Sequence, residues 1–222
     1  MCFSANVSFG AGLVLTAISV ASIKKVQDPK QLMFASIPLI FGLQQFTEGI
    51  LWDTLTNINF RTTQKAATYV YLFLAQILWP IYVPIAIMLL KKNKKRQTTQ
   101  RILIASGITI GLYLGYCLLS YPVEANIIGH HIAYSQDYPK GFRYYGMVLY
   151  ALATIFPPFF SRIKHMKLLG LTILLSYIFT AIFYTHYILS VWCFFSSLIS
   201  ISVYKIMVNQ QRNNVLGTGK GY

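Results

Sequence analysis

The sequence predicts an all-α integral membrane protein with seven transmembrane helices, its N-terminus outside and its C-terminus inside the cell. Of its 222 residues, 55% are hydrophobic and only 11% are charged, with a mean hydropathy of +0.54. A soluble domain carries about a quarter charged residues, so this composition indicates a polytopic membrane protein. The apolar residues form long runs, and most basic residues fall between alternate runs, as in cytoplasmic loops.

Seven apolar segments approach the length of about 20 helical residues that crosses a bilayer. The first, residues 6–23, is followed rather than preceded by lysines, which indicates a retained helix rather than a cleaved signal peptide. The fifth is short, prolines predict kinks in the third and fifth, and only a tight turn near Thr185 and His186 separates the last two. Residues 1–208 thus form the predicted transmembrane domain, and residues 209–222 a polar, flexible tail. The later segments cover residues 32–55, 67–90, 102–121, 145–160, 168–184 and 187–207.

The basic residues set the predicted orientation. With the N-terminus outside, the inner loops and tail hold fifteen of the 19 Lys and Arg residues, and the outer side holds four. The net charge of +14 is therefore loop charge, and we expect no nucleic-acid partner, because no recognised nucleic-acid fold accompanies it. The outer residues are Arg61, Lys65, Lys140 and Arg143, and the inner ones are Lys24, Lys25, Lys30, Lys91, Lys92, Lys94, Lys95, Arg96, Arg101, Arg162, Lys164, Lys167, Lys205, Arg212 and Lys220.

The second segment carries a carboxylate inside an apolar helix. Glu48 shares a helix face with Gln44, Gln45 and Trp52, because these residues are spaced by three, four or seven positions. An ionisable group is costly in hydrocarbon and therefore usually faces the interior of a helix bundle or a wet cavity. At about 1.5 Å per residue, Glu48 lies roughly 10 Å below the outer end of its helix.

These positions predict an outward-facing polar pocket centred on Glu48. Gln76, in the next segment, lies roughly 14 Å below the outer end of its own helix, a depth from which it can meet Glu48. In the alternative interpretation, a protonated Glu48 is packed into a hydrogen-bond network between helices. The expected ligand-binding residues are Gln44, Gln45, Glu48, Trp52, Gln76 and Trp192.

The fourth segment carries Gly107, Gly111 and Gly115, one every four residues. Small residues at this spacing let two helix backbones approach closely. The pattern predicts either a homodimer face or close packing within the bundle.

The longest connection, residues 122–143, is an outer loop rich in aromatic and polar residues. Such loops are typical of a lid or binding loop, or of a segment lying on the lipid headgroups. Its histidines, His130 and His131, are candidate metal ligands, although no spacing approaches a zinc signature. His186, at the outer turn between the last two segments, is a candidate metal ligand together with Glu48, or a general base.

An enzymatic interpretation stays open beside the binding pocket. If Met1 is removed, Cys2 becomes an N-terminal thiol and a candidate nucleophile. Cys2, His186 and Glu48 all fall on the outer side, which permits a thiol–imidazole–carboxylate arrangement. The protein would then be a membrane-embedded hydrolase or transferase that uses Cys2, or a metal held by His186 and Glu48. A third interpretation makes it a small structural subunit of a membrane complex.

Two stretches of the sequence carry a resemblance. The opening Met-Cys-Phe-Ser-Ala and the later Phe-Gly-Leu-Gln-Gln-Phe-Thr-Glu-Gly-Ile-Leu-Trp resemble a family of uncharacterised bacterial multi-pass membrane proteins, which implies location and fold only. The predicted layout is also similar to membrane-embedded zinc hydrolases of the alkaline ceramidase type, but the paired HxxxH that those enzymes need is absent from this sequence.

The residues therefore favour a protein of the bacterial inner membrane that contacts the lipid bilayer along most of its length. Its pocket would bind a small molecule, an ion or a lipid headgroup for transport or sensing, with Glu48 carrying the charge or proton. No cofactor is indicated by any motif in the sequence.

Overall fold

The first helix and the third pack against each other through glycines and phenylalanines. The computed structural model describes residues 4–90, 97–183 and 195–218, and its first helix is α1 (Ala5–Ile23), followed by η1 (Pro29–Gln31), α2 (Leu32–Ala35) and α3 (Ile37–Thr54). A Cβ added at Gly12 would meet the Phe46 ring at 2.8 Å, and one at Gly49 would meet the Phe9 ring at 2.8 Å. Each ring therefore fills the space that a glycine of the other helix leaves open.

The next long helix is continuous and combines α-helical and π-helical turns. After η2 (Ile58–Phe60) come α4 (Arg61–Leu72), the π-helix η3 (Phe73–Leu78) and α5 (Trp79–Leu89). The predicted segment 67–90 thus begins earlier, at Arg61, and the predicted segment 32–55 is interrupted at Ser36, where α2 ends and α3 begins. Ser36 Oγ accepts or donates a hydrogen bond at 2.7 Å with Tyr82 Oη of α5, which holds this break against the bundle.

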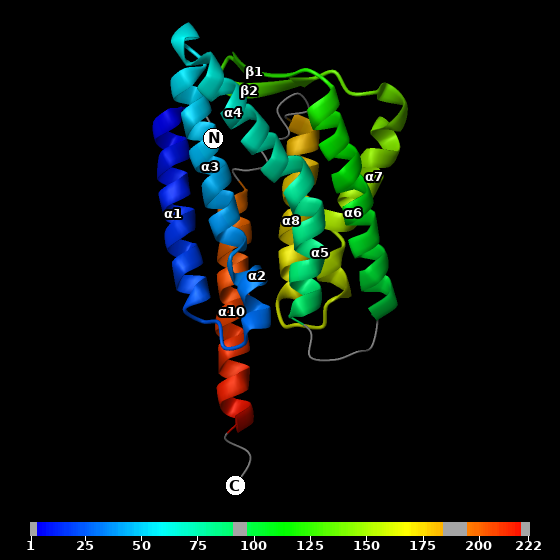
Figure 1. Ribbon diagram of the computed structural model, residues 1–222. Coiled ribbons are helices and arrows are strands. Elements are labelled where there is room, and N and C mark those ends of the chain that lie inside the picture. The colour runs from blue at the N-terminus through cyan, green and yellow to red at the C-terminus, as the bar shows by residue number, and fades with distance from the viewer. Residues whose placement is uncertain (1–3, 91–96, 184–194, 219–222) are drawn as a thin grey trace.

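A β-hairpin takes the place of the predicted outer loop. Following α6 (Gln97–Ser120), β1 (Val123–Ile128) pairs in antiparallel register with β2 (His131–Gln136). Gly129, in the turn, has φ of 62°, a left-handed conformation that glycine adopts without a steric penalty. The predicted outer loop thus contains a strand pair, which lies across one end of the bundle (Figure 1).

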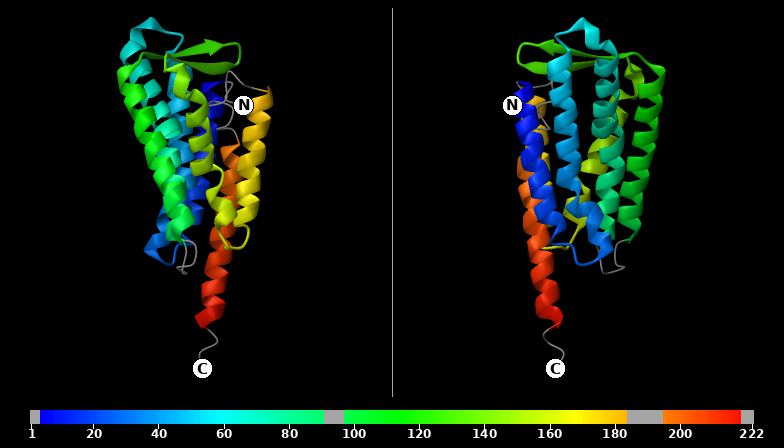
Figure 2. Two further views of the ribbon diagram at one scale, coloured as in Figure 1. Left: turned by 90° about the vertical axis from the view of Figure 1, so that its right-hand side faces the viewer. Right: turned by 60° about the vertical axis from the view of Figure 1, so that its left-hand side comes forward.

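The last third of the chain returns through shorter and longer helices. The elements are η4 (Lys140–Phe142), α7 (Arg143–Thr154), η5 (Pro157–Phe160), α8 (Met166–Phe183) and α10 (Ser196–Thr218). The predicted segment 145–160 is thus split between α7 and η5, because the pair Pro157–Pro158 cannot continue a regular helix. Helix α10 continues to Thr218, beyond the predicted end at residue 207, and extends past the bundle at the end opposite the hairpin (Figure 2).

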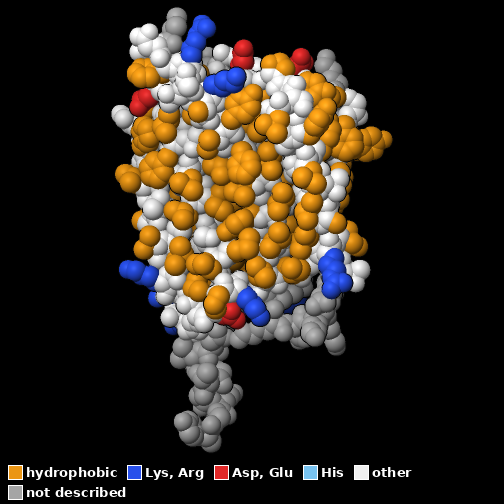
Figure 3. Space-filling model, in the orientation of Figure 1, with side chains coloured by type: hydrophobic (Ala, Val, Ile, Leu, Met, Phe, Trp, Pro, Cys, Tyr) orange, Lys and Arg blue, Asp and Glu red, His pale blue; other side chains and the backbone are white. Residues whose placement is uncertain are grey.

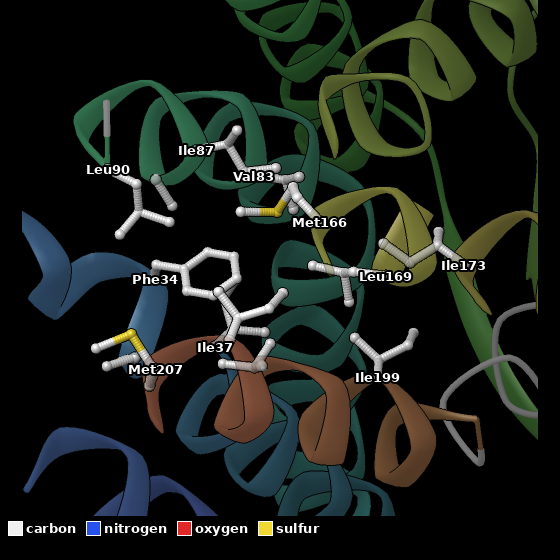
Figure 4. Packing of buried hydrophobic residues seen from close by; sticks show 14 of the residues in the cluster. Phe34, Ile37, Val83, Ile87, Leu90, Met166, Leu169, Ile173, Ile199 and Met207 are labelled. Atoms are coloured by element: carbon white, nitrogen blue, oxygen red, sulfur yellow. The ribbon is translucent and has the colours of Figure 1, made fainter. Parts of the chain in front are cut away.

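The core at the end opposite the hairpin is apolar and joins four helices. Phe34 of α2 is fully buried, between Ile87 of α5, Leu169 of α8 and Met207 of α10 (Figure 4). In a bilayer such a core is held by close van der Waals packing, because lipid tails are as apolar as the side chains that they would replace.

The face of the bundle shown in Figure 3 is apolar around its middle and charged at both ends. Leu13 of α1 is 65% exposed, Leu112 of α6 is 68% exposed and Leu119 is 83% exposed. Within the described residues, four helical stretches are long and apolar enough to cross a membrane: Ala5–Ile23, Arg61–Leu89, Thr98–Ser120 and Met166–Phe183. The prediction of a helical protein suited to a membrane is confirmed at this level.

The glycines of α6 contact the same chain. A Cβ at Gly107 would collide with the Pro80 carbonyl oxygen of α5, and one at Gly111 would meet Ile81 Cδ1 at 2.8 Å. Pro84 has no N–H to offer the Pro80 carbonyl, so α6 approaches an oxygen that lacks the usual helical donor four residues ahead. The close approach that the spacing predicts thus occurs within the bundle. A homodimer through Gly107, Gly111 and Gly115 stays a prediction.

Candidate functional site

Helix α3 presents a row of buried polar side chains to the interior of the bundle. Gln44 is 1% exposed, Gln45 is 2% exposed and Glu48 is 0% exposed. All five Asp and Glu residues of the chain lie in the described ranges, and Glu48 is the one among them that is buried. The helix face predicted from the spacing is therefore an interior face, and a carboxyl group there is removed from water.

Trp79 holds one member of this row in place. Its indole Nε1 donates a hydrogen bond of 3.0 Å to Gln44 Oε1, and its ring lies 4.2 Å from that of Phe41, measured between centroids. The bond fixes the Gln44 side-chain oxygen toward α5 and joins α3 to α5 one helical turn from Glu48. Trp79 was missed from the predicted site, and its only signal in the sequence is its place beside Pro80 in an apolar segment.

The Gln76 side chain forms a hydrogen bond with the hairpin. Its Nε2 donates a hydrogen bond of 3.0 Å to Gln136 Oε1 of β2, and its Oε1 accepts a long one, 3.5 Å, from Tyr138 Oη. Burial raises the pKa of the Tyr138 hydroxyl, which keeps that group protonated and able to donate. Gln76 therefore connects the π-helix to the hairpin, on the side of the bundle where the strands lie.

The π-helix that carries Gln76 has a local cause. In an α-helix the Gln76 carbonyl would bond to the N–H of residue 80, which is a proline and has none. The wider turn of the π-helix, with hydrogen bonds between residues five apart, spans this position. The neighbouring Ala75 carbonyl accepts a 2.6 Å hydrogen bond from Tyr150 Oη of α7. Such π segments inside longer helices are frequent at functional sites.

The hairpin packs closely on the ends of the helices beneath it. Ile132 is fully buried in a cluster with Leu51 of α3 and Tyr71 of α4. The Tyr134 ring stacks on the Tyr71 ring at 4.6 Å with an interplanar angle of 6°. Residues 132, 134 and 136 alternate along β2 and so share the face directed at the bundle. The hairpin therefore covers the end of the bundle toward which Trp52 lies.

Trp52 and Gln136 each bury a hydrogen-bond donor under this cover. Trp52 packs against the cluster beneath the hairpin, and its indole Nε1 is buried without a hydrogen-bond acceptor among the described residues. Gln136 Nε2 is also buried without an acceptor among the described residues, while Oε1 of the same side-chain amide accepts a hydrogen bond from Gln76 Nε2. Most buried polar atoms in proteins are paired, so two such N–H donors at one end of the bundle are informative.

The predicted metal and catalytic residues are only partly described. Cys2, His186 and Trp192 lie outside the described residues. His130 is exposed in the hairpin turn, and burial lowers the pKa of the neighbouring His131, favouring a neutral imidazole. Within the described part of the chain, no three side chains of His, Cys, Asp or Glu come together in a way that would hold a metal ion.

Replacing Gln76 by leucine is expected to loosen the hairpin without unfolding the bundle. The change removes the bond to Gln136, and a net loss of about 1 kcal/mol corresponds to roughly fivefold faster exchange of the hairpin amides. Hydrogen exchange over residues 123–136, read by mass spectrometry, measures the effect. Gln211→Leu, near the far end of α10, is the matched control, and equal exchange in both variants would contradict the role given to Gln76.

Comparison with known proteins gives a family without an assigned activity. A family model described as a family of unknown function (DUF6629) matches residues 1–217. None of the curated proteins and none of the solved structures compared with the chain matches it.

Proposed function

Since the chain belongs to this family of unknown function, its activity has to be inferred from the site, and we propose that it is a multi-pass bacterial inner-membrane protein whose Glu48 binds a proton or a cationic ligand group. The ligand would be a small molecule, an ion or a lipid headgroup, and its binding would serve transport or sensing. The hairpin end of the bundle is the outer end in this proposal.

The alternating course of the helices supports seven passes. Successive long helices run in opposite directions between the two ends of the bundle (Figures 1 and 2). The hairpin, together with the turn between α3 and α4, lies at the end where the sequence places few basic residues. The links from α1 to η1 and from η5 to α8 lie at the other end, with Lys24, Lys25 and Arg162. With the hairpin outside, this distribution follows the positive-inside rule.

The observation that carries the proposal is the complete burial of Glu48. A carboxyl group inside an apolar bundle is stable when it takes up a proton or faces a cation and hydrogen-bond donors. Gln44 and Gln45 lie within one helical turn of it, and both are buried. A group that changes state by gaining a proton or a cation suits transport or sensing, in which binding has to be reversible.

A hydrophobic carbodiimide tests this proposal directly. The O–H of a protonated carboxyl group adds across one C=N bond of the reagent, and migration of the acyl group to nitrogen leaves a stable N-acylurea whose mass is that of the acid plus the reagent. We expect mass spectrometry of the labelled protein to place the adduct on Glu48. We expect labelling to fall as pH rises and as Na⁺ or tetramethylammonium is added.

The exposed Glu124 in the same sample is the internal control, because its labelling should not respond to those cations. Absence of an adduct on Glu48 across the pH range in which the protein stays folded would show that the carboxyl group does not exchange with its surroundings, and would refute the proposal.

A further inference from the structure

From the donors beneath the hairpin we infer that the ligand is zwitterionic, with an ammonium group at Glu48 and a phosphate or carboxylate oxygen at Trp52. The inference rests on the proposed function and specifies the class of ligand for the same site. It joins three groups that come from two elements: the Glu48 carboxyl group, the Trp52 indole and the Gln136 side-chain amide.

The spacing along α3 sets the size of the ligand. Glu48 and Trp52 are four residues apart and therefore lie on one helix face, one above the other, separated by about one helical pitch of 5.4 Å. Trp52 is on the hairpin side of Glu48, and its buried Nε1 has no acceptor among the described residues. A molecule that met both groups would thus carry a cation and an acceptor separated by about four or five bonds.

The hairpin supplies a second donor of the same kind. Gln136 lies on the bundle-facing side of β2, two residues beyond Tyr134, which packs in the same cluster as Trp52. The Gln136 Oε1 accepts a hydrogen bond from Gln76 Nε2, so the buried Gln136 Nε2 is directed away from Gln76. Trp52 Nε1 and Gln136 Nε2 are both N–H donors without an acceptor among the described residues, so they call for an oxygen rather than for a second cation.

Ligands with a single charge fit this arrangement poorly. A simple cation would match Glu48 but would leave the Trp52 and Gln136 donors unpaired, and an unpaired buried donor costs free energy. A simple anion would match the donors but would meet the Glu48 carboxylate. An aminoalkyl phosphate such as phosphoethanolamine satisfies both requirements, as does the headgroup of phosphatidylethanolamine, which has the same chemistry in a lipid.

Protection of Glu48 from the carbodiimide tests the inference. The full chain is placed in nanodiscs of phosphatidylglycerol, which has no amine, and labelled in the presence of phosphoethanolamine, tetramethylammonium or inorganic phosphate. A second set of nanodiscs contains phosphatidylethanolamine. We expect phosphoethanolamine or the ethanolamine lipid to protect Glu48 at concentrations at least tenfold lower than tetramethylammonium, and inorganic phosphate not to protect. Protection by the soluble probe indicates a free molecule, and protection by the lipid alone indicates a headgroup.

The variant Trp52→Phe keeps an aromatic ring and removes the N–H donor. We expect it to remove the preference for the zwitterion, so that phosphoethanolamine and tetramethylammonium protect Glu48 at similar concentrations. Equal protection by both probes in the wild type would overturn the inference and leave Glu48 as a cation site, whether or not the variant folds. Absence of labelling at Glu48 would overturn both the inference and the proposed function.

Discussion

Gly107→Ala is expected to lower the free energy of unfolding by about 3 kcal/mol, because overpacking a filled contact costs about 1–3 kcal/mol and a backbone neighbour places the change at the upper end. The added methyl group would collide with the Pro80 carbonyl, which belongs to the backbone of α5 and has no rotamer with which to move aside. Helices α5 and α6 would have to separate. The contact of α6 with α7 would be disturbed as well, because the Cβ of Ala153 would lie 3.3 Å from the new methyl group.

Gly115→Ala on the same helix is the matched control. Its methyl group would meet Ile77 Cδ1 at 3.5 Å, an ordinary van der Waals contact. Alanine in a helix is favoured over glycine by about 0.5–1 kcal/mol, so this variant should be slightly more stable than the wild type. Thermal unfolding of both variants in the same detergent measures the contrast. Equal melting temperatures would show that α6 does not rest on α5 at Gly107.

Glu48→Gln is expected to keep the fold and to abolish cation binding. Glutamine has the same shape and can hydrogen-bond within the bundle, so the melting temperature should change by only a few degrees, whereas the negative charge is lost. Removing one partner of a buried charge pair costs about 3–5 kcal/mol, which corresponds to at least about a hundredfold loss of affinity for tetramethylammonium. Carbodiimide labelling at this position should disappear as well.

Asp53→Asn changes an exposed acid of the same helix and serves as the control for the loss of a carboxylate. It should bind the cation as the wild type does. If Glu48→Gln also bound tetramethylammonium as the wild type does, Glu48 would be a packed, protonated residue, and the interpretation of the protein as a structural subunit would gain support.

The hairpin shows what sequence patterns can and cannot indicate. Val123, Ala125 and Ile127 alternate with more polar residues, and Gly129 follows, which together are the pattern of a strand leading into a tight turn. The length and polarity of residues 122–143 outweigh this signal and predict an outer loop instead. Whether such strands cover the bundle or lie on the lipid headgroups depends on the packing of Ile132 and Tyr134 against Leu51 and Tyr71. These partners are far away in the sequence.

The apolar segments, the interior face of α3 and the close approach of α6 can all be predicted from the amino-acid sequence. Each of these depends on the cost of placing one residue type in hydrocarbon or on spacing within one helix, and both are properties of local sequence. The hydrogen bonds of Trp79 with Gln44 and of Gln76 with Gln136, and the contact of Gly107 with Pro80, become visible only in the folded bundle. These contacts join helices and strands distant in the chain, and which segments become neighbours depends on the packing energy of the whole bundle.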